Sequence, residues 1–416
     1  MSIPVVTGIG VVSPFGAGKE TFFSGLHEAR SGLGPITLFD AGGLKTRVAG
    51  EVKNFNPADH LKEEDLKRVP RVVALGVAAS REAFRDAGID VRNLSLEERR
   101  GTGVVIGTGA GGIDFAEAQY AHFFQGETRK ATPYAVSSSF VGMLSSEISI
   151  YLGLRGPSHV ISTGCTASTD AIGYASRLIR HGEFERVLTG GAEACITPGI
   201  LAGFERMKVL SQGFNEAPER ASRPFNADRN GFVLGEGAWI FLLEALEAAR
   251  KRSAKIYGAV AGYGSTCEAY HRVMIEPSGD EPARAMEVAI RDAGIEKEEI
   301  DYVNLHGTST QMNDWIETVA VKKAFGACAR RIFTSSTKSM VGHPQGASGA
   351  AGVAASLYAF TRNEIPPTIN YEMPDPQCDL NYTPNRPVKK EVRYALNNCL
   401  AFGSKNSCLV LRKAEC

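Results

Sequence analysis

The sequence predicts an α/β protein with a duplicated, layered fold made of two pseudo-symmetric halves. Three observations lead to this prediction. The chain has 416 residues, which is more than one ordinary hydrophobic core supports. It is 43% apolar and holds 45 glycines, a composition that suits tight turns between strands and helices. Four stretches of the first half also recur, in the same order, in the second half.

The recurring stretches are short and rich in glycine and small apolar residues. They pair "PVVTGIGVVS" with "GAVAGYGSTC", "SREAFRDAGI" with "MEVAIRDAGI", "GVVIGTGAGG" with "VNLHGTSTQM", and "ISTGCTASTDAIGYASRLIR" with "SSTKSMVGHPQGASGAAGVAASLYAF". The last pair matches Cys165 with His343. We expect one half over residues 1–252 and the other over 253–416, with extra residues in the first half, at about 113–158, that line an interface or a substrate.

Strand-like and helix-like runs alternate within each half. Runs rich in β-branched residues predict strands at "GVVIGT", "HVISTG", "RVLTGGAEA", "IDYVNLHG" and "RIFTSSTKS". The stretches "RVVALGVAASREAFRDAG" and "EPARAMEVAIRDAG" predict helices that end at glycine, which readily adopts a helix C-cap conformation. Alternation of this kind is typical of mostly parallel sheets covered by helices, with a site where strand ends converge.

Charge and cysteine content narrow the class of protein. Lys and Arg number 46 and Asp and Glu number 46, so the chain has no net charge. This balance gives no indication of a nucleic-acid-binding protein. The eight cysteines form no CxxC pair and no Cys/His metal spacing, which indicates free thiols in a reducing compartment. No signal-like leader and no apolar run of membrane-spanning length is present. We expect a cytoplasmic protein with no metal and no membrane partner.

Cys165 is the first candidate for chemistry. It lies between a β-like run and a predicted helix from Ala167 to Arg180, so the positive end of that helix would lower its thiol pKa. Small neighbours leave room for a substrate. The alternative is a small buried residue at a crowded turn, which is the more common role of a free cysteine.

Three further candidates lie in the second half, at glycine-rich turns equivalent to those of the first. They are His306 in "NLHGTST", Lys338 in "STKSMVG" and His343 in "VGHPQG". Each histidine has an alternative as a core or turn residue, and the lysine as a surface charge. Together with Cys165 they suit thioester chemistry, in which a thiolate takes an acyl group and two imidazole N–H groups stabilise an enolate. A protease-like site explains neither the second histidine nor the repeat.

At these residues the sequence resembles the β-ketoacyl-acyl carrier protein synthases of the thiolase superfamily, most closely the elongating, synthase II type. The resemblance covers essentially the whole chain and implies the thiolase-like, duplicated α/β/α/β/α layered fold. Its motifs, in order, are "VVTGIGVVSPFG", "GLRGP", "STGCTAS", "GGAEACITP", "ASRPFNADRNGFVLGEGA", "NLHGTST", "STKSMVGH", "PPTINYE", "CDLNYTPN" and "NNCLAFGSKNS".

This resemblance implies a decarboxylative Claisen condensation in fatty-acid or polyketide chain elongation. Cys165 would carry the acyl chain. His306 and His343 would support decarboxylation of a malonyl-thioester and hold the enolate, and Lys338 would shape the electrostatic field of the site. Backbone N–H groups of Cys165 and Phe402 would form the oxyanion hole, with the Phe402 ring as a gate.

The resemblance also assigns supporting positions and partners. Thr308 and Thr310 would lie near the pantetheine arm, with Asp314 and Glu317 behind the site. The chemistry would need no metal and no cofactor beyond the phosphopantetheine that arrives on acyl carrier protein. A homodimer is implied, because the family's acyl tunnel ends at the partner subunit.

Several positions depart from the family pattern. The family's glutamate that pairs the active-site lysine is replaced by Gly352, which leaves Glu317 as a substitute partner for Lys338. A hydroxyl residue at the pantetheine is replaced by Val273, and the "AFGSKN" loop carries Ser404 and Lys405.

Two small residues bear on the acyl pocket. Ala110 and Ala135 occupy positions where bulkier side chains limit the tunnel in relatives, so we expect a pocket that tolerates long or rigid acyl chains.

Three other functions compete with this one. The first is the ketosynthase subunit of a type II polyketide system, which pairs with a cysteine-less chain-length factor in a heterodimer. The second is a non-catalytic chain-length partner, against which Cys165 argues. The third is a biosynthetic thiolase, for which Cys399 would be the second cysteine but lacks the matching motif.

Overall fold

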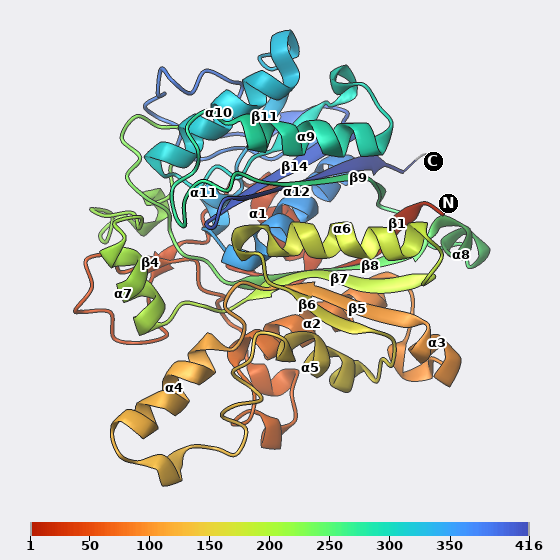
Figure 1. The fold of residues 1–416 in the computed structure, drawn as a ribbon, viewed down its shortest axis with the longest axis vertical. Helices are drawn as coiled ribbons and strands as arrows, with labels where there is room; N and C mark the ends of the chain where they lie inside the picture. The colour runs from red at the N-terminus through yellow and green to blue at the C-terminus, as the bar shows by residue number, and fades with distance from the viewer. Residues whose placement is uncertain (1, 415–416) are drawn as a thin grey trace.

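The computed structural model describes residues 2–414 (Figure 1). Within this range eleven strands form one large sheet in the order β11-β10-β14-β15-β9-β1-β8-β7-β5-β6, with β2 paired to β1. The strands are β1 (Pro4–Ser13), β2 (Gly16–Ala17), β5 (Thr102–Gly107), β6 (Ser158–Ile161), β7 (Arg186–Glu193), β8 (Gly237–Ala245), β9 (Gly258–Cys267), β10 (Tyr302–Asn304), β11 (Phe333–Ser335), β14 (Tyr394–Ala401) and β15 (Lys405–Lys413). Two small hairpins pair β3 (Gly34–Pro35) with β4 (Val48–Ala49) and β12 (Glu364–Ile365) with β13 (Val388–Lys389).

The helices lie between and outside these strands. They are α1 (Lys19–His27), α2 (Arg71–Asp86), α3 (Leu96–Arg100), α4 (Ile113–Phe124), α5 (Met143–Leu152), α6 (Ala167–Arg180), α7 (Pro198–Arg206), α8 (Leu246–Lys251), α9 (Asp280–Ala293), α10 (Gln311–Phe325), α11 (Lys338–Val341) and α12 (Ser348–Arg362). The predicted helix after Cys165 has the bounds of α6, and α2 and α9 end beside Gly88 and Gly294, both at positive φ as predicted.

The duplication predicted from the repeats is confirmed by the strand order. Read outward from the central β1–β9 pair, the first half runs β1, β8, β7, β5, β6 and the second half runs β9, β15, β14, β10, β11. Each pair of equivalent neighbours also has the same relative direction. The boundary expected at 252/253 falls between α8 and β9, and the division of the chain into two halves at this point stays a prediction.

The layers follow from which helices pack on which face (Figure 1). α6 and α12 lie in the middle and share the largest hydrophobic core with residues of the strands on both sides. α2 and α5 cover the outer face of the first half, and α9 and α10 cover that of the second. This arrangement gives the five predicted layers, because each amphipathic helix must bury its apolar face against a sheet.

The prediction of mostly parallel sheets is wrong, since each half is mixed. β5 runs parallel to β6 and β7, but β8 is antiparallel to both of its neighbours. In the second half β14 and β15 form a hairpin closed by Gly403 and Ser404 at φ of 85° and 64°. A turn this short can join only antiparallel strands.

The first half has more chain between β5 and β6 than the second has between β10 and β11. α5 packs on α2 as α10 packs on α9, so the extra chain is α4 and the loop after it. In Figure 1 α4 projects from the body of the molecule. None of the helices within residues 2–414 has the length and apolar character to cross a membrane. The seven cysteines in this range are free thiols, and Cys416 lies outside it.

Two equivalent turns carry the chain into the central helices. The turn at 164–166 precedes α6, and the turn at 345–347 precedes α12. Their backbone angles match residue by residue: the residue before the helix has φ −87°, ψ −5° at Thr166 and φ −86°, ψ 0° at Ala347. Cys165 is therefore equivalent to Gly346, and the expected match with His343 is wrong by three residues.

Candidate active site

A cavity of about 440 Å³ opens at Cys165, where the turn before α6 meets the second half of the chain. It combines apolar walls with a few polar groups, as ligand sites commonly do. The lining residues are Cys165, Met207, Lys208, Val209, Asn230, Gly231, Phe232, Val273, Met274, Ile275, His306, Thr308, Thr310, Gln311, Met312, Asn313, His343, Gln345, Leu400, Ala401 and Phe402.

The Cys165 thiol is buried at the bottom of this cavity. Its Sγ donates a hydrogen bond to Oε1 of Gln345 at 3.6 Å. Burial raises the thiol pKa to about 12, while the charge of Lys338 and the backbone N–H of Phe402 act in the opposite direction. The expectation of a lowered pKa is wrong, because desolvation of a thiolate here outweighs the positive groups around it. The backbone N–H of Phe402 lies close to the sulfur, and its role in an oxyanion hole stays a prediction.

His306 and His343 face each other above the thiol. Their rings are 5.2 Å apart between centroids and nearly perpendicular, at 88°. Burial, together with the charge of Lys338, holds the pKa of both imidazoles well below the ordinary 6.5. Nδ1 of His343 shares a 2.8 Å hydrogen bond with the Ser348 hydroxyl, which leaves Nε2 free for a substrate. Both rings are thus neutral near pH 7.

Lys338 is buried at the start of α11 and acts on the site through its charge. Burial lowers its pKa, and the surrounding Cys399, Glu317 and Cys165 oppose that shift. The expected ion pair with Glu317 is wrong: among the described residues Lys338 has no carboxylate within 4.0 Å. Glu317 instead accepts from the N–H groups of His306 (2.6 Å) and Gly307 (2.7 Å) and from the Asn398 amide (2.6 Å).

Glu317 therefore holds the backbone that carries His306. Burial raises the pKa of its carboxyl to about 7, and the three donors oppose that shift. The glutamate missing at Gly352 could not fit this chain, since a Cβ there would lie 1.9 Å from Oδ1 of Asn397 and 2.5 Å from Oδ1 of Asn304.

Asp314 also lies behind the cavity and not in its wall. It is fully buried and accepts from the N–H of Phe225 at 2.9 Å, and its carboxylate lies 3.6 Å from Arg229. Burial raises the pKa of Asp314, and the Arg229 charge opposes that shift. Arg229 pairs further with Asp375 at 2.5 Å.

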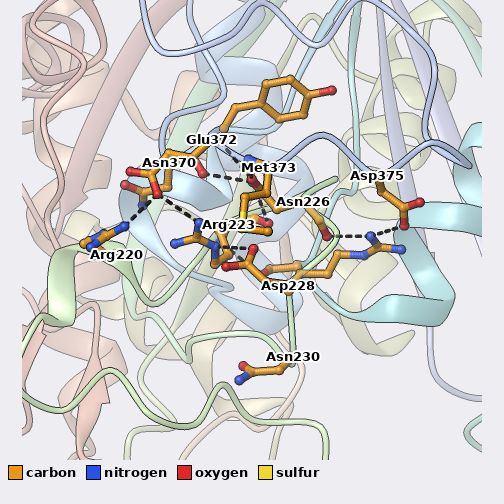
Figure 2. Close-up of polar contacts among 12 residues, drawn as sticks. Arg220, Arg223, Asn226, Asp228, Asn230, Asn370, Glu372, Met373 and Asp375 are labelled. Carbon is orange, nitrogen blue, oxygen red and sulfur yellow. Dashed lines mark hydrogen bonds and ion pairs between the residues drawn. The ribbon is translucent and has the colours of Figure 1, made fainter.

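Figure 2 shows the polar network that continues from this pair. Oδ1 of Asn226 accepts from the N–H groups of Glu372 (2.9 Å) and Met373 (2.7 Å). Arg223, only 2% exposed, pairs with Asp228 at 2.8 Å and with Glu372 at 3.0 Å. These bonds fix the segment that supplies Asn230, Gly231 and Phe232 to the cavity wall.

The loop carrying Phe402 is hydrogen-bonded to the neighbouring loop at 268–275, and both loops line the cavity. The N–H of Gly403 donates to the carbonyl of Arg272 at 2.9 Å, and the Ser404 hydroxyl donates to the carbonyl of His271 at 3.0 Å. Ser404 thus joins the two loops, and Val273 lines the cavity beside Phe402. Lys405 begins β15 and does not line the cavity.

The remaining predicted residues divide into two groups. Thr308 and Thr310 line the cavity and share a 3.0 Å hydrogen bond between their hydroxyls. Ala110 and Ala135 do not line it. Ala110 borders instead a small apolar cluster around Ile196 and Phe232. Phe232, which packs edge-on against His343, was missed because nothing local in the sequence marks a residue brought in from a distant loop. Gln345 was missed although it lies only two residues after His343.

The donor atoms of Cys165, His306 and His343 lie within 4.8 Å of one another, a spacing that a metal ion could bridge. The charge of Lys338 acts on all three residues, however, and disfavours a second cation among them. The arrangement fits a nucleophile beside two neutral hydrogen-bond donors better than it fits a metal site.

Fold and site together define a thiol acyltransferase with a duplicated, thiolase-like architecture. The model of "Beta-ketoacyl synthase, N-terminal domain" matches residues 4–249, and that of "Beta-ketoacyl synthase, C-terminal domain" matches residues 257–372. The chain belongs to the β-ketoacyl synthase family.

Relatives and solved structures agree with this assignment. The chain is 42% identical over 411 residues to 3-oxoacyl-[acyl-carrier-protein] synthase 2 of Synechocystis sp., covering 99% of this chain and 98% of that protein. The protein of the same name from Coxiella burnetii is 39% identical over 98% of both chains. The structure of the ishigamide ketosynthase/chain length factor has a TM-score of 0.92 and 36% identity over the whole of both chains. A type II polyketide synthase acyl-carrier protein in complex with its ketosynthase has a TM-score of 0.90 and 30% identity, again over the whole of both chains.

These likenesses extend from end to end. The chain is a ketosynthase of the synthase II type, an acyltransferase that lengthens acyl chains by decarboxylative condensation and works with acyl carrier protein.

Proposed function

We propose that Cys165 carries the growing acyl chain and that His306, His343 and Lys338 prepare the malonyl unit that extends it. The support is the convergence of a buried thiol and two neutral imidazoles on one cavity, with their donor atoms within 4.8 Å.

In the first half-reaction, Sγ of Cys165 attacks the carbonyl carbon of an acyl thioester on acyl carrier protein. A C–S bond to Cys165 forms, the C–S bond to the carrier breaks, and the thiol proton passes to the leaving sulfur. An imidazole relays this proton, since the donor atoms of Cys165, His306 and His343 lie within 4.8 Å of one another. The N–H groups of Phe402 and Cys165 stabilise the negative oxygen of the intermediate.

In the second half-reaction, a malonyl thioester occupies the cavity. Its C–C bond to the carboxylate breaks, carbon dioxide leaves, and the electron pair becomes an enolate held by N–H groups of His306 and His343. The nucleophilic carbon then attacks the acyl-Cys165 thioester, a C–C bond forms, the C–S bond to Cys165 breaks, and the thiolate leaves and takes up a proton from water. Neutral imidazoles suit this step, since each can donate a hydrogen bond to the enolate oxygen. The carrier's pantetheine arm passes Thr308 and Thr310, and Phe402 gates the mouth. The groups named here supply the whole reaction, without a metal or a resident cofactor.

The test is reconstitution with octanoyl- and malonyl-acyl carrier protein, followed by mass spectrometry of the carrier. The expected product is the 3-oxodecanoyl-carrier. Cys165→Ala should form neither this product nor an acyl-enzyme. An acyl-enzyme on Cys165→Ala would overturn the proposal.

A homodimer is the second part of the proposal. Large apolar side chains are exposed on the extra chain of the first half and next to it, among them Phe124 (89%), Ile150 (70%), Phe140 (64%) and Val136 (61%). Apolar side chains gathered in one region mark an interaction surface. Sedimentation of the purified chain should give twice the monomer mass.

The type II polyketide alternative is favoured by the similarity, over the whole chain, to the ketosynthase of a type II polyketide synthase and to the ishigamide ketosynthase/chain length factor. Purification from the native source discriminates the two: a heterodimer with a similar, cysteine-less chain supports the polyketide reading, and a homodimer supports fatty-acid elongation. Acceptance of long or rigid acyl chains stays a prediction in either case, but Ala110 and Ala135 do not line the cavity and therefore do not support it. A strong preference for chains of four carbons or fewer would contradict this expectation.

A further inference from the structure

We propose that the Gln345 amide recognises the acyl chain on Cys165 and selects chains that carry an oxygen atom at the third carbon. This inference rests on the proposed function and names the substrate class of the same site.

The first observation is conformational. The turns before α6 and α12 are equivalent, and each begins with a residue at positive φ: Gly164 at 71° and Gln345 at 39°. Glycine adopts this region freely, whereas a residue with a Cβ is strained there. The second half thus keeps a side chain where the first half keeps glycine, at a cost to conformational stability. A side chain retained against strain points to a functional role.

The second observation is where this side chain lies. Gln345 lines the cavity, and its Oε1 accepts the hydrogen bond from Sγ of Cys165. Its Nε2 is buried and has no hydrogen-bond partner among the described residues. Because Nε2 and Oε1 share one carbon atom, the unpaired donor is next to the position where an acyl chain on Sγ begins.

Acylation of Cys165 changes the hydrogen-bond partners that the Gln345 amide requires. The thiol loses its hydrogen, so Oε1 loses its donor while Nε2 remains unpaired. A saturated chain covers both atoms with methylene groups, which is unfavourable for buried polar groups. A 3-oxo group supplies an acceptor for Nε2, and a 3-hydroxyl group supplies both an acceptor and a donor for Oε1. The acyl group that completes the site is therefore oxygenated at the third carbon.

The experiment compares three pantetheine thioesters of equal length: octanoyl, 3-oxooctanoyl and 3-hydroxyoctanoyl. The rate of acyl transfer to Cys165 is measured by mass spectrometry of the intact protein. The wild-type enzyme should take both oxygenated chains roughly tenfold faster than octanoyl, a factor typical of one satisfied buried donor.

Gln345→Leu keeps a similar side-chain volume without the amide. It should lose the preference, mainly by accepting octanoyl faster. Gln345→Gly removes the strain and the amide together, so it should also lose the preference while unfolding at a higher temperature.

The outcomes separate this inference from the proposed function. If no thioester labels Cys165, the proposed function fails. If all three label it equally in the wild-type enzyme, or if Gln345→Leu slows all three alike, Gln345 has only a structural role and the inference is overturned.

Discussion

The imidazole rings of His306 and His343 meet edge to face, 5.2 Å apart between centroids, although 36 residues of chain separate them. Both rings are buried, and the charge of Lys338 acts on each of them. This contact brings two neutral N–H donors to one point of the cavity, and the first prediction follows from it.

Malonyl decarboxylation should be insensitive to mild acid. Because the pKa of both imidazoles lies well below 6.5, neither gains a proton as the pH falls from about 8 to about 6.5. The carboxyl of Glu317, with a pKa of about 7, would titrate within this range, so the test uses Cys165→Ala combined with Glu317→Gln. The rate of carbon dioxide release by this double variant, which cannot condense, should stay constant from about pH 8 to about 6.5. The exposed His181 provides a control, since His181→Gln should give the same profile. A rate that halves near pH 6.5 would show a solvated imidazole and contradict the prediction.

Alkylation of Cys165 should report its raised pKa. With a thiol pKa of about 12, the rate of iodoacetamide labelling should rise about tenfold per pH unit from about pH 7 to 9, without a plateau. Lys338→Met should slow labelling several-fold, because removing the positive charge raises the thiol pKa further. Lys62→Met, at an exposed site, is the matched control and should leave the rate unchanged. Peptide mapping of the labelled cysteine measures both effects, and a plateau below pH 8 would rule out the raised pKa.

Asp314 should be a large contributor to stability. Asp314→Ala removes one of the two carboxylates beside the buried guanidinium of Arg229, and it frees the N–H of Phe225. Breaking a buried pair of this kind costs about 3 kcal/mol in the free energy of unfolding. Asp379→Ala is the matched control, since the partly exposed pairs of Asp379 with Lys322 and Arg330 contribute less than about 1 kcal/mol. Urea unfolding compares the two variants, and equal losses would refute the assignment.

Gly352 should not tolerate a side chain. A Cβ at this position meets the Asn397 amide, so Gly352→Ala should lower the free energy of unfolding by about 2 kcal/mol or more. Asn397→Ala in the same protein should recover part of the loss, because it removes the atom in the way. Gly43→Ala is the control, since no atom lies within 4 Å of its built Cβ. The absence of any recovery in the double variant would show that the strain lies elsewhere.

Much of the fold follows from local patterns in the chain. The bounds of α6 and the ends of α2 and α9 were predictable, because apolar periodicity and a glycine at the helix end act within a few residues. The internal repeat predicted the duplicated layers, and with them the convergence of Cys165, His306, Lys338 and His343. Nothing local predicted the mixed strand directions, which depend on the connections between strands.

The sequence by itself determined the architecture, the nucleophile candidate and the family, because each is written in residue types and their order along the chain. Only the tertiary structure decided the electrostatics of the site. Burial turns Cys165 into a thiol of high pKa, and Glu317 binds the backbone at His306 instead of Lys338. The tertiary structure also places Gln345, whose backbone is strained, beside the sulfur of Cys165. Desolvation and contacts between distant segments exist only once the chain is folded, so no stretch of sequence carries them.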